Sequence, residues 1–353
     1  MSRFFSSKYK ALTPYTPGEQ PQDMKYIKLN TNESPYPTSE KAQRAAAEAA
    51  KKAQLYPDPE CRELTEKLAD MCGLSFENIL VTNGSDEILN FAFMAFCDES
   101  CPAVFPDITY GFYPVYATLN NVPYTEIPLR EDFTIDTSEY YNKKSTIFIA
   151  NPNAPTGIAL SLSEIEEIVR QNPDNVVVID EAYVDFGAES ALSLIPKYDN
   201  LLVIQTFSKS RSMAGARLGF GAASRELIAD LNTVKFSTNP YNINRMTMAA
   251  GIGVLEDEEY TRNNCRRIQK TRAYTVSELK NMGFESTDSL ANFIFVRHPK
   301  RDGEGLYREL KARGILVRHF SKPRLSDWLR ITIGSREEME SLIKTLREML
   351  GGN

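Results

Sequence analysis

The stretch LLVIQTFSKSRSMAGARLG, from Leu201 to Gly219, determines how the rest of the chain is interpreted. It opens with an apolar run, Leu201 to Ile204, that suits a buried strand. Hydroxyl side chains, Lys209 and Arg217 follow this run. Hydroxyls and cations at the end of a strand suit an anionic ligand at the carboxyl edge of a parallel sheet. Taken alone, Lys209 fits a solvated loop lysine better, because most lysines are exposed.

Apolar segments of strand length alternate with helical segments over the first two thirds of the chain. The strands that we expect lie at 78–82, 102–105, 123–127, 145–150, 176–179 and 201–204. This spacing predicts βαβ units and therefore an α/β fold, with a mostly parallel sheet covered by helices on both faces. Long helices are expected from about 223 to 282, and the remaining residues alternate as in a smaller α+β domain, with one of its strands expected over 315–320.

Three parts of the chain follow from this pattern. Residues 1–37 are expected to form an arm that contributes to the small domain, although their composition also fits a disordered tail. Residues 38–245 are expected to form the large domain that binds the ligand. Residues 246–353 are expected to form a connecting helix and the small C-terminal domain.

Composition and charge exclude several classes of function. The 353 residues are 42% hydrophobic and 25% charged, which is the balance of a globular protein, and the net charge of −6 argues against a nucleic-acid partner. No apolar run suggests a membrane span or a signal peptide, so we expect a cytoplasmic protein. Five scattered cysteines are expected to be reduced thiols. With only His298 and His319, neither a metal site nor a histidine-centred triad is expected.

Chemically unusual residues follow three of the expected strands, at Asn151–Gly157, Asp180–Tyr183 and Ser208–Lys209. Asp180 closes an apolar strand, and a buried carboxylate needs a cationic partner or hydrogen bonds. A purely structural pair between Asp180 and a lysine or arginine would also meet this need. The three segments are expected to meet at one edge of the sheet.

A fourth segment, Asn83-Gly84-Ser85-Asp86-Glu87, lies where a strand turns into a helix. Free backbone N–H groups and the helix dipole favour a phosphate at such a place. The alternative is an ordinary Ser or Asp helix cap without a ligand.

Together these residues fit a pyridoxal phosphate site. Lys209 would bond the cofactor aldehyde, Asp180 would keep the ring nitrogen protonated, and Tyr183 would hydrogen-bond the ring oxygen. Tyr110 would stack on the ring. The phosphate would be held by Thr206, Ser208, Arg217 and the N–H groups of Gly84, Ser85 and Asp86.

From about Leu12 to the C-terminus the sequence resembles the fold-type-I pyridoxal-phosphate aminotransferases, and within them the histidinol-phosphate aminotransferases. The resemblance is carried by LNTNESPYP, LYPDP, VTNGSDEIL, DITYGFY, NPNAPTG, VVVIDEAYVDF, TFSKS, GARLGF and WLRITIG. It implies the same roles for Lys209, Asp180, Tyr183 and Tyr110 as those given above. It further implies that Arg330 grips the substrate and that Tyr56 reaches the cofactor phosphate of a neighbouring subunit in a homodimer.

The sequence departs from this family at one position. Most relatives have an asparagine before Pro155-Thr-Gly, and that asparagine bonds the ring oxygen of the cofactor, whereas this chain has Ala154. Asn153 or Asn151 could take the role, or Tyr183 could fill it alone.

The resemblance implies a ping-pong transamination of histidinol phosphate with 2-oxoglutarate. Arg330 and Arg318 are candidates for the substrate phosphate, although Arg318 also fits an exposed arginine at a strand end. Tyr15 and Asn32 are candidates for the imidazole end. The alternatives are an aromatic aminotransferase, a threonine-phosphate decarboxylase of the same fold, and a ligand-sensing regulator domain, for which no helix-turn-helix is readable.

Overall fold

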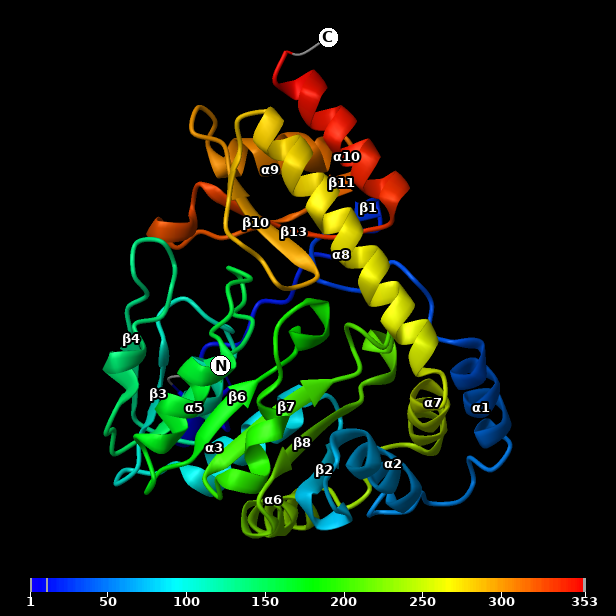
Figure 1. Cartoon of the computed structure of the whole chain (residues 1–353), viewed down its shortest axis with the longest axis vertical. Helices are drawn as coiled ribbons and strands as arrows, with labels where there is room; N and C mark the ends of the chain where they lie inside the picture. The colour runs from blue at the N-terminus through cyan, green and yellow to red at the C-terminus, as the bar shows by residue number, and fades with distance from the viewer. Residues whose placement is uncertain (1, 11, 352–353) are drawn as a thin grey trace.

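The protein is described by a computed structural model that covers residues 2–10 and 12–351, and it has two parts stacked along its long axis (Figure 1). The large part is built on a seven-stranded sheet in the order β2-β8-β7-β6-β5-β3-β4. Its strands are β2 (Ile79–Thr82), β3 (Ala103–Pro106), β4 (Tyr124–Ile127), β5 (Thr146–Ala150), β6 (Val177–Asp180), β7 (Leu201–Thr206) and β8 (Gly219–Ala223). The neighbours from β4 to β7 are all parallel, whereas β8 runs antiparallel to both β2 and β7. The predicted α/β fold with a mostly parallel sheet is confirmed.

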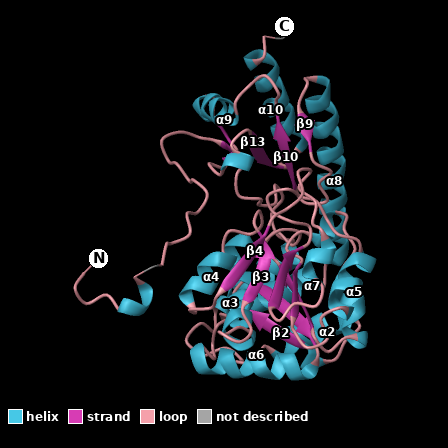
Figure 2. Cartoon of the chain, turned by 90° about the vertical axis from the view of Figure 1, so that its left-hand side faces the viewer, coloured by secondary structure: helices cyan, strands magenta, loops and turns pink. Residues whose placement is uncertain are grey.

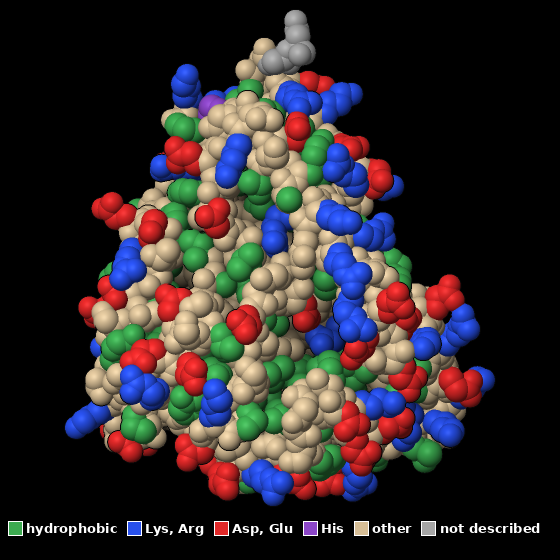
Figure 3. All heavy atoms as spheres, viewed as in Figure 1, with side chains coloured by type: hydrophobic (Ala, Val, Ile, Leu, Met, Phe, Trp, Pro, Cys, Tyr) green, Lys and Arg blue, Asp and Glu red, His purple; other side chains and the backbone are tan. Residues whose placement is uncertain are grey.

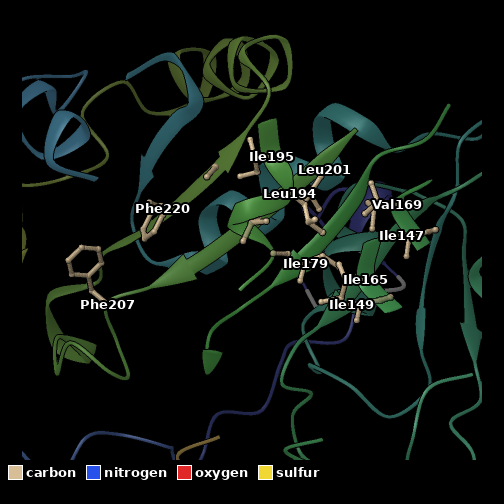
Figure 4. Packing of buried hydrophobic residues seen from close by; sticks show 14 of the residues in the cluster. Ile147, Ile149, Ile165, Val169, Ile179, Leu194, Ile195, Leu201, Phe207 and Phe220 are labelled. Atoms are coloured by element: carbon tan, nitrogen blue, oxygen red, sulfur yellow. The ribbon is translucent and has the colours of Figure 1, made fainter. Parts of the chain in front are cut away.

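Helices cover both faces of this sheet. They are α1 (Glu40–Ala50), α2 (Arg62–Cys72), α3 (Ser85–Phe96), α4 (Tyr113–Leu119), α5 (Leu162–Arg170), α6 (Arg225–Thr238) and α7 (Arg245–Leu255). Successive residues of a strand point to opposite faces. Ile147 and Ile149 therefore pack with Ile165 of α5 on one face (Figure 4). Phe148 lies on the other face and stacks on Phe93 of α3 at 4.2 Å.

The small part contains an antiparallel sheet in the order β12-β13-β10-β9 and a two-stranded parallel sheet of β1 and β11. The strands are β1 (Ile27–Lys28), β9 (Glu285–Ser286), β10 (Phe293–Arg297), β11 (Ile315–Leu316), β12 (Arg318–His319) and β13 (Trp328–Thr332). The helices are α8 (Glu258–Asn281), α9 (Gly303–Ala312) and α10 (Arg336–Met349). The long helix α8 runs from the large part to the small part (Figure 1).

Two details differ from the expectations. The single strand expected over 315–320 is wrong, because β11 and β12 belong to different sheets. The boundary expected at 245/246 falls in the first turn of α7, and α7 packs against α1 and α2 of the large part. We therefore propose that the connecting segment begins at α8. None of the helices in the described residues is long and apolar enough to cross a membrane.

The segment before β1 joins the two parts. Its first residues extend away from the body of the molecule (Figure 2). Farther along, Glu19 pairs with Tyr307 and Lys311 of α9. Asn30 donates to the carbonyl of Glu19 at 2.8 Å. Since β1 pairs with β11, we propose that part of the arm belongs to the small part.

Candidate active site

A cavity of about 390 Å³ lies at the carboxyl ends of the parallel strands. Its walls come from the sheet, from the first turn of α3 and from the arm. The lining residues are Gln20, Thr31, Glu33, Ser85, Asp86, Tyr110, Ala150, Ala154, Asp180, Ala182, Tyr183, Thr206, Ser208, Lys209, Ala214, Gly215 and Arg217. Most of the residues proposed to bind a cofactor are therefore brought together in one place.

Lys209 lies in the turn that follows β7. The Ser208 N–H donates to Thr206 Oγ1 at 3.1 Å, which shapes the turn. The ammonium of Lys209 donates to the carbonyl of Thr31 at 3.2 Å. Burial, together with the nearby Arg330, lowers the pKa of Lys209 to about 8. A lysine with a lowered pKa has a large neutral, nucleophilic fraction near neutral pH, so Lys209 is no solvated loop lysine.

Asp180, the last residue of β6, is only 5% exposed. It accepts hydrogen bonds from the Tyr113 hydroxyl and from the Ala182 N–H, both at 3.2 Å. No lysine or arginine of the described residues forms an ion pair with it, so the alternative of a structural pair does not hold. Burial raises the pKa of Asp180 to about 7, whereas the hydrogen bond from Tyr113 acts in the opposite direction. A buried acid without a cation suits the protonated nitrogen of a ligand ring.

The turn between β2 and α3 meets Arg217 at the other end of the cavity. Gly84 has φ +75°, and a Cβ placed on it would lie 2.5 Å from Nη2 of Arg217. Arg217 itself has φ +57°; its Nη2 bonds Asp86 Oδ2 at 2.8 Å and its Nη1 bonds the Ser208 hydroxyl at 3.4 Å. Guanidinium, hydroxyls and the open N-terminus of α3 thus form a cradle that fits a phosphate.

Two tyrosines complete the walls of the cavity. The Tyr110 hydroxyl donates to Asp86 at 2.6 Å. Tyr183 contacts the ring of Phe293 edge-on at 5.0 Å, and its hydroxyl accepts a hydrogen bond from Asn32 at 3.0 Å. Burial raises the pKa of Tyr183, while Arg330 and the bond from Asn32 act in the opposite direction. Tyr183 therefore keeps its proton at neutral pH and can donate it to a ligand.

The loop with the unusual alanine turns its asparagines away from the cavity. Asn153 accepts from Thr109 at 2.8 Å and donates to Ile108 and Thr156. The Asn151 amide closes the same loop through two bonds with Leu160. Ala154 lines the cavity in place of an asparagine. Of the three candidates for the ring oxygen, Tyr183 is the one that lines the cavity.

The residues that line the cavity include none of the substrate candidates, which are Arg330, Arg318, Tyr15 and Asn32. Arg330 on β13 lies opposite Arg318 on β12, and Nη2 of Arg330 donates to the carbonyl of Asn30 at 3.1 Å. Tyr15 stacks on Phe112 at 4.2 Å. Tyr56 lies elsewhere: it is 79% exposed and stacks on Tyr241 at 4.7 Å, so it does not reach the cavity of its own chain.

Sequence reasoning missed several contributors to the cavity. Tyr113 bonds Asp180, Thr31 accepts from Lys209, and Glu33 and Gln20 form part of the wall. Thr31 and Glu33 lie in LNTNESPYP, whose contacts with the sheet bridge more than 140 positions of sequence, so only the fold reveals them. Among the described residues, no group of three or more His, Cys, Asp or Glu that could hold a metal ion is present.

A ligand that carries an aldehyde, a ring nitrogen and a phosphate would fit this cavity: Lys209 would bind the aldehyde, Asp180 the ring nitrogen and Arg217 the phosphate. The fold and the site thus define a pyridoxal-phosphate-dependent enzyme of fold type I. The sequence profile of the class I and II aminotransferases matches residues 24–346. The chain belongs to this family, and it is an aminotransferase whose cofactor is pyridoxal 5′-phosphate.

Relatives share nearly the whole chain. The histidinol-phosphate aminotransferase of Brachyspira hyodysenteriae is 48% identical over 352 residues, which is 99% of both chains. Histidinol-phosphate aminotransferase 1 of Bradyrhizobium diazoefficiens is 47% identical over 99% of this chain and 100% of its own.

Solved structures agree with the fold. A putative histidinol-phosphate aminotransferase of Erwinia carotovora matches with a TM-score of 0.85 at 27% identity, over 92% of this chain and 96% of the other. The histidinol-phosphate aminotransferase of Sinorhizobium meliloti in complex with pyridoxal 5′-phosphate matches with a TM-score of 0.87 at 22% identity, over 99% and 98%. The predicted class of enzyme and its cofactor are confirmed.

Proposed function

We propose that this enzyme transfers the amino group of L-histidinol phosphate to 2-oxoglutarate, giving imidazole acetol phosphate and glutamate in histidine biosynthesis. The relatives that share 47–48% of their residues over the full chain bear the name of this activity. The structural observation that carries the proposal is a pair of neighbouring arginines, Arg330 and Arg318, that form no ion pair with a carboxylate among residues 2–10 and 12–351.

These arginines suit a phosphate monoester. Arg330 is half-buried, its Nε has no partner among the described residues, and burial lowers its pKa. Arg318 donates only long bonds, 3.4 and 3.5 Å, to the carbonyls of Pro17 and Thr16 in the arm. Both guanidinium groups lie within 5.7 Å of the ring of Phe320. Two neighbouring unpaired forks can bind a dianion, and Arg330 can bind a carboxylate of 2-oxoglutarate in the other half-reaction.

The residues of the cavity then act in concert. The bound cofactor supplies an electron sink for negative charge at the amine-bearing carbon of the substrate. Asp180 holds a proton at the ring nitrogen, and the Tyr183 hydroxyl donates to the ring oxygen. Lys209 Nζ, whose pKa is about 8, takes up the proton from the amine-bearing carbon. Gln20, Thr31 and Glu33 of the arm form part of the cavity wall and would limit the access of water.

The decisive experiment measures glutamate formed from 2-oxoglutarate with histidinol phosphate, phenylalanine or tyrosine as the amine donor. We expect histidinol phosphate to give the highest kcat/KM. Lys209→Ala is expected to abolish turnover while the fold survives. Turnover of phenylalanine and tyrosine alone would favour an aromatic aminotransferase. Release of carbon dioxide from threonine phosphate, without a need for 2-oxoglutarate, would favour the decarboxylase.

The phosphate role of Arg318 has its own test. Arg318→Ala should raise KM for histidinol phosphate at least about tenfold, because a charge-assisted bond contributes about 1.5–3 kcal/mol, and change KM for phenylalanine little. Arg324→Ala is the matched control: it removes a cation that pairs with Asp107 at 3.3 Å. Equal losses of affinity for both substrates in Arg318→Ala would contradict the phosphate role.

We also propose that the active unit is a cytoplasmic homodimer with shared sites. Leu55, Tyr56 and Tyr241 are exposed by 57%, 79% and 44% and form an apolar surface beside the α1–α2 connection. A second copy would bury this surface and bring Tyr56 to the neighbouring cofactor phosphate. Positive and negative side chains are mixed over the face seen in Figure 3, which does not suggest a nucleic-acid partner.

A further inference from the structure

Asn32, in the segment LNTNESPYP, has a backbone conformation that asparagine tolerates better than most residues. Its φ is +56°, and it is 1% exposed. Asn292 Nδ2 donates to its carbonyl at 2.9 Å, and its own N–H donates to the Thr332 hydroxyl at 2.9 Å. Groups from the small part therefore hold Asn32 at a fixed place beside the cavity.

The same contacts fix which way the Asn32 amide points. Since the Thr332 hydroxyl accepts the Asn32 N–H, its own proton is free to donate to Asn32 Oδ1, at 3.0 Å. The NH₂ end of the amide then faces Tyr183 and donates to its hydroxyl oxygen at 3.0 Å. In a flipped amide the Thr332 hydroxyl proton would lose its acceptor on Asn32, so the bond from Thr332 favours the orientation in which the NH₂ end faces Tyr183.

A phenol whose oxygen accepts one bond has one proton left to donate. No acceptor for the Tyr183 proton lies within hydrogen-bond distance in the part of the chain that the structure describes, and Tyr183 lines the cofactor cavity. The proton is therefore directed into the cavity. With Ala154 in place of the usual asparagine, Tyr183 is the donor that remains for the ring oxygen.

We propose that Asn32 is a positioning residue: its amide, oriented by Thr332, occupies the acceptor side of the Tyr183 hydroxyl and directs the phenol proton at the ring oxygen of the cofactor. This inference rests on the proposed roles of Lys209 and Tyr183. It replaces the expectation that Asn32 contacts the imidazole end of the substrate. Thr332 lies two residues after Arg330 on the same strand, so one element of the small part holds both the substrate arginine and the support of Tyr183.

The test is a pH titration of the visible absorbance of the bound cofactor in the holoenzyme. A hydrogen bond to the ring oxygen stabilises its anionic form and lowers the titration midpoint, so loss of the bond raises the midpoint. Four charged groups face Tyr183: Arg330, Asp180, Asp86 and Lys209. The variants at Asn32 and Tyr183 leave all four unchanged.

Asn32→Gly removes the amide without adding charge and tolerates the positive φ. We expect it to raise the midpoint by about half a unit to one unit, and Tyr183→Phe to raise it by about one unit or more. In the Tyr183→Phe background, Asn32→Gly should add nothing, because it acts through the phenol. Thermal unfolding of the cofactor-free variants reports whether each one folds.

Asn32→Asp provides a second test, since its carboxylate would accept the phenol proton and turn it away from the cavity. Asn30→Asp is the matched control for the added charge, because the Asn30 amide bonds Glu19 and not Tyr183. We expect Asn32→Asp to raise the midpoint well above that of Asn30→Asp. If Asn32→Gly does not fold, the comparison of Asn32→Asp with Asn30→Asp tests the proposal instead.

Three results would overturn the proposal. One is a wild-type midpoint in Asn32→Gly, and another is an equal shift by Asn32→Gly with and without Tyr183. The third is a wild-type midpoint in Tyr183→Phe, which would also remove Tyr183 from its assigned role. A failure of the proposed function itself is recognised separately, by a wild-type enzyme that does not transaminate histidinol phosphate.

Discussion

Replacing Asp180 by asparagine should remove a pH dependence from the stability of the cofactor-free enzyme. In the folded protein, burial raises the pKa of Asp180 from 3.8 to about 7. Since the folded-state pKa lies above the unfolded one, the stabilising contribution of this carboxyl is full below about pH 4. It is lost as the pH rises through about 7. Asparagine has nearly the same shape and carries no charge, so the variant lacks this loss.

The size of the effect follows from the shift in pKa. One unit corresponds to about 1.4 kcal/mol, so about three units set an upper bound of about 4 kcal/mol over the whole range. About half of this free-energy difference arises between pH 5.5 and pH 8. The stability of Asp180→Asn relative to wild type should therefore increase by about 2 kcal/mol over this interval.

Urea unfolding of the cofactor-free proteins at the two pH values measures this difference. Glu181→Gln is a matched control, because burial also raises the pKa of Glu181 to about 7. The Glu181 carboxylate points away from the cavity and accepts from Ser190, Ala191 and Gln205. The free energy of unfolding of both variants should depend less on pH than that of the wild type. Only Asp180→Asn should also weaken cofactor binding. An unchanged difference between Asp180→Asn and wild type at the two pH values would refute the reasoning.

Two further predictions concern the cofactor phosphate. Gly84→Ala should weaken cofactor binding at least about tenfold, because the new Cβ would lie 2.5 Å from Arg217 Nη2 and strain a residue at φ +75°. Fluorescence titration of the cofactor-free enzyme checks this, with Gly73→Ala as the control, because Gly73 has φ +67°, does not line the cavity and would meet nothing within 4 Å. Tyr56→Phe should weaken cofactor binding severalfold without changing monomer stability, since Tyr56 is 79% exposed in one chain and is proposed to reach the cofactor phosphate of the other. Equal affinities of Tyr56→Phe and wild type would contradict the shared site.

Local sequence signals predicted the elements of the fold well. The Ser-x-x-Glu patterns at Ser161 and Ser335 are typical of capping boxes, and in the structure they begin α5 and α10. The apolar run from Leu201 forms a fully buried strand. The antiparallel direction of β8 was not predicted, because the alternation of apolar residues fixes which face a strand buries but not which way it runs.

The candidate site was predicted only as far as its residues lie near strand ends. Asp180 ends β6, Tyr183 and Lys209 lie three residues after β6 and β7, and Arg217 lies two residues before β8; all four line the cavity. The bond between Tyr113 and Asp180 joins residues 67 positions apart, and the bond between Asn32 and Tyr183 joins residues 151 positions apart. No local pattern encodes such contacts, since they depend on the packing of the two parts of the molecule.

The pairing of β1 with β11 has a consequence for synthesis of the chain. Ile27 and Lys28 find their partners only at Ile315 and Leu316, and the Asn32 N–H finds Thr332, which lies 300 positions later. A nascent chain must therefore hold its arm unpaired until residues 315–332 have left the ribosome, and long-range closure of this kind is slow. The large part can form first, whereas the catalytic pocket is completed only after these residues have emerged. Fragments cut at α8 should consequently remain inactive unless both are present together.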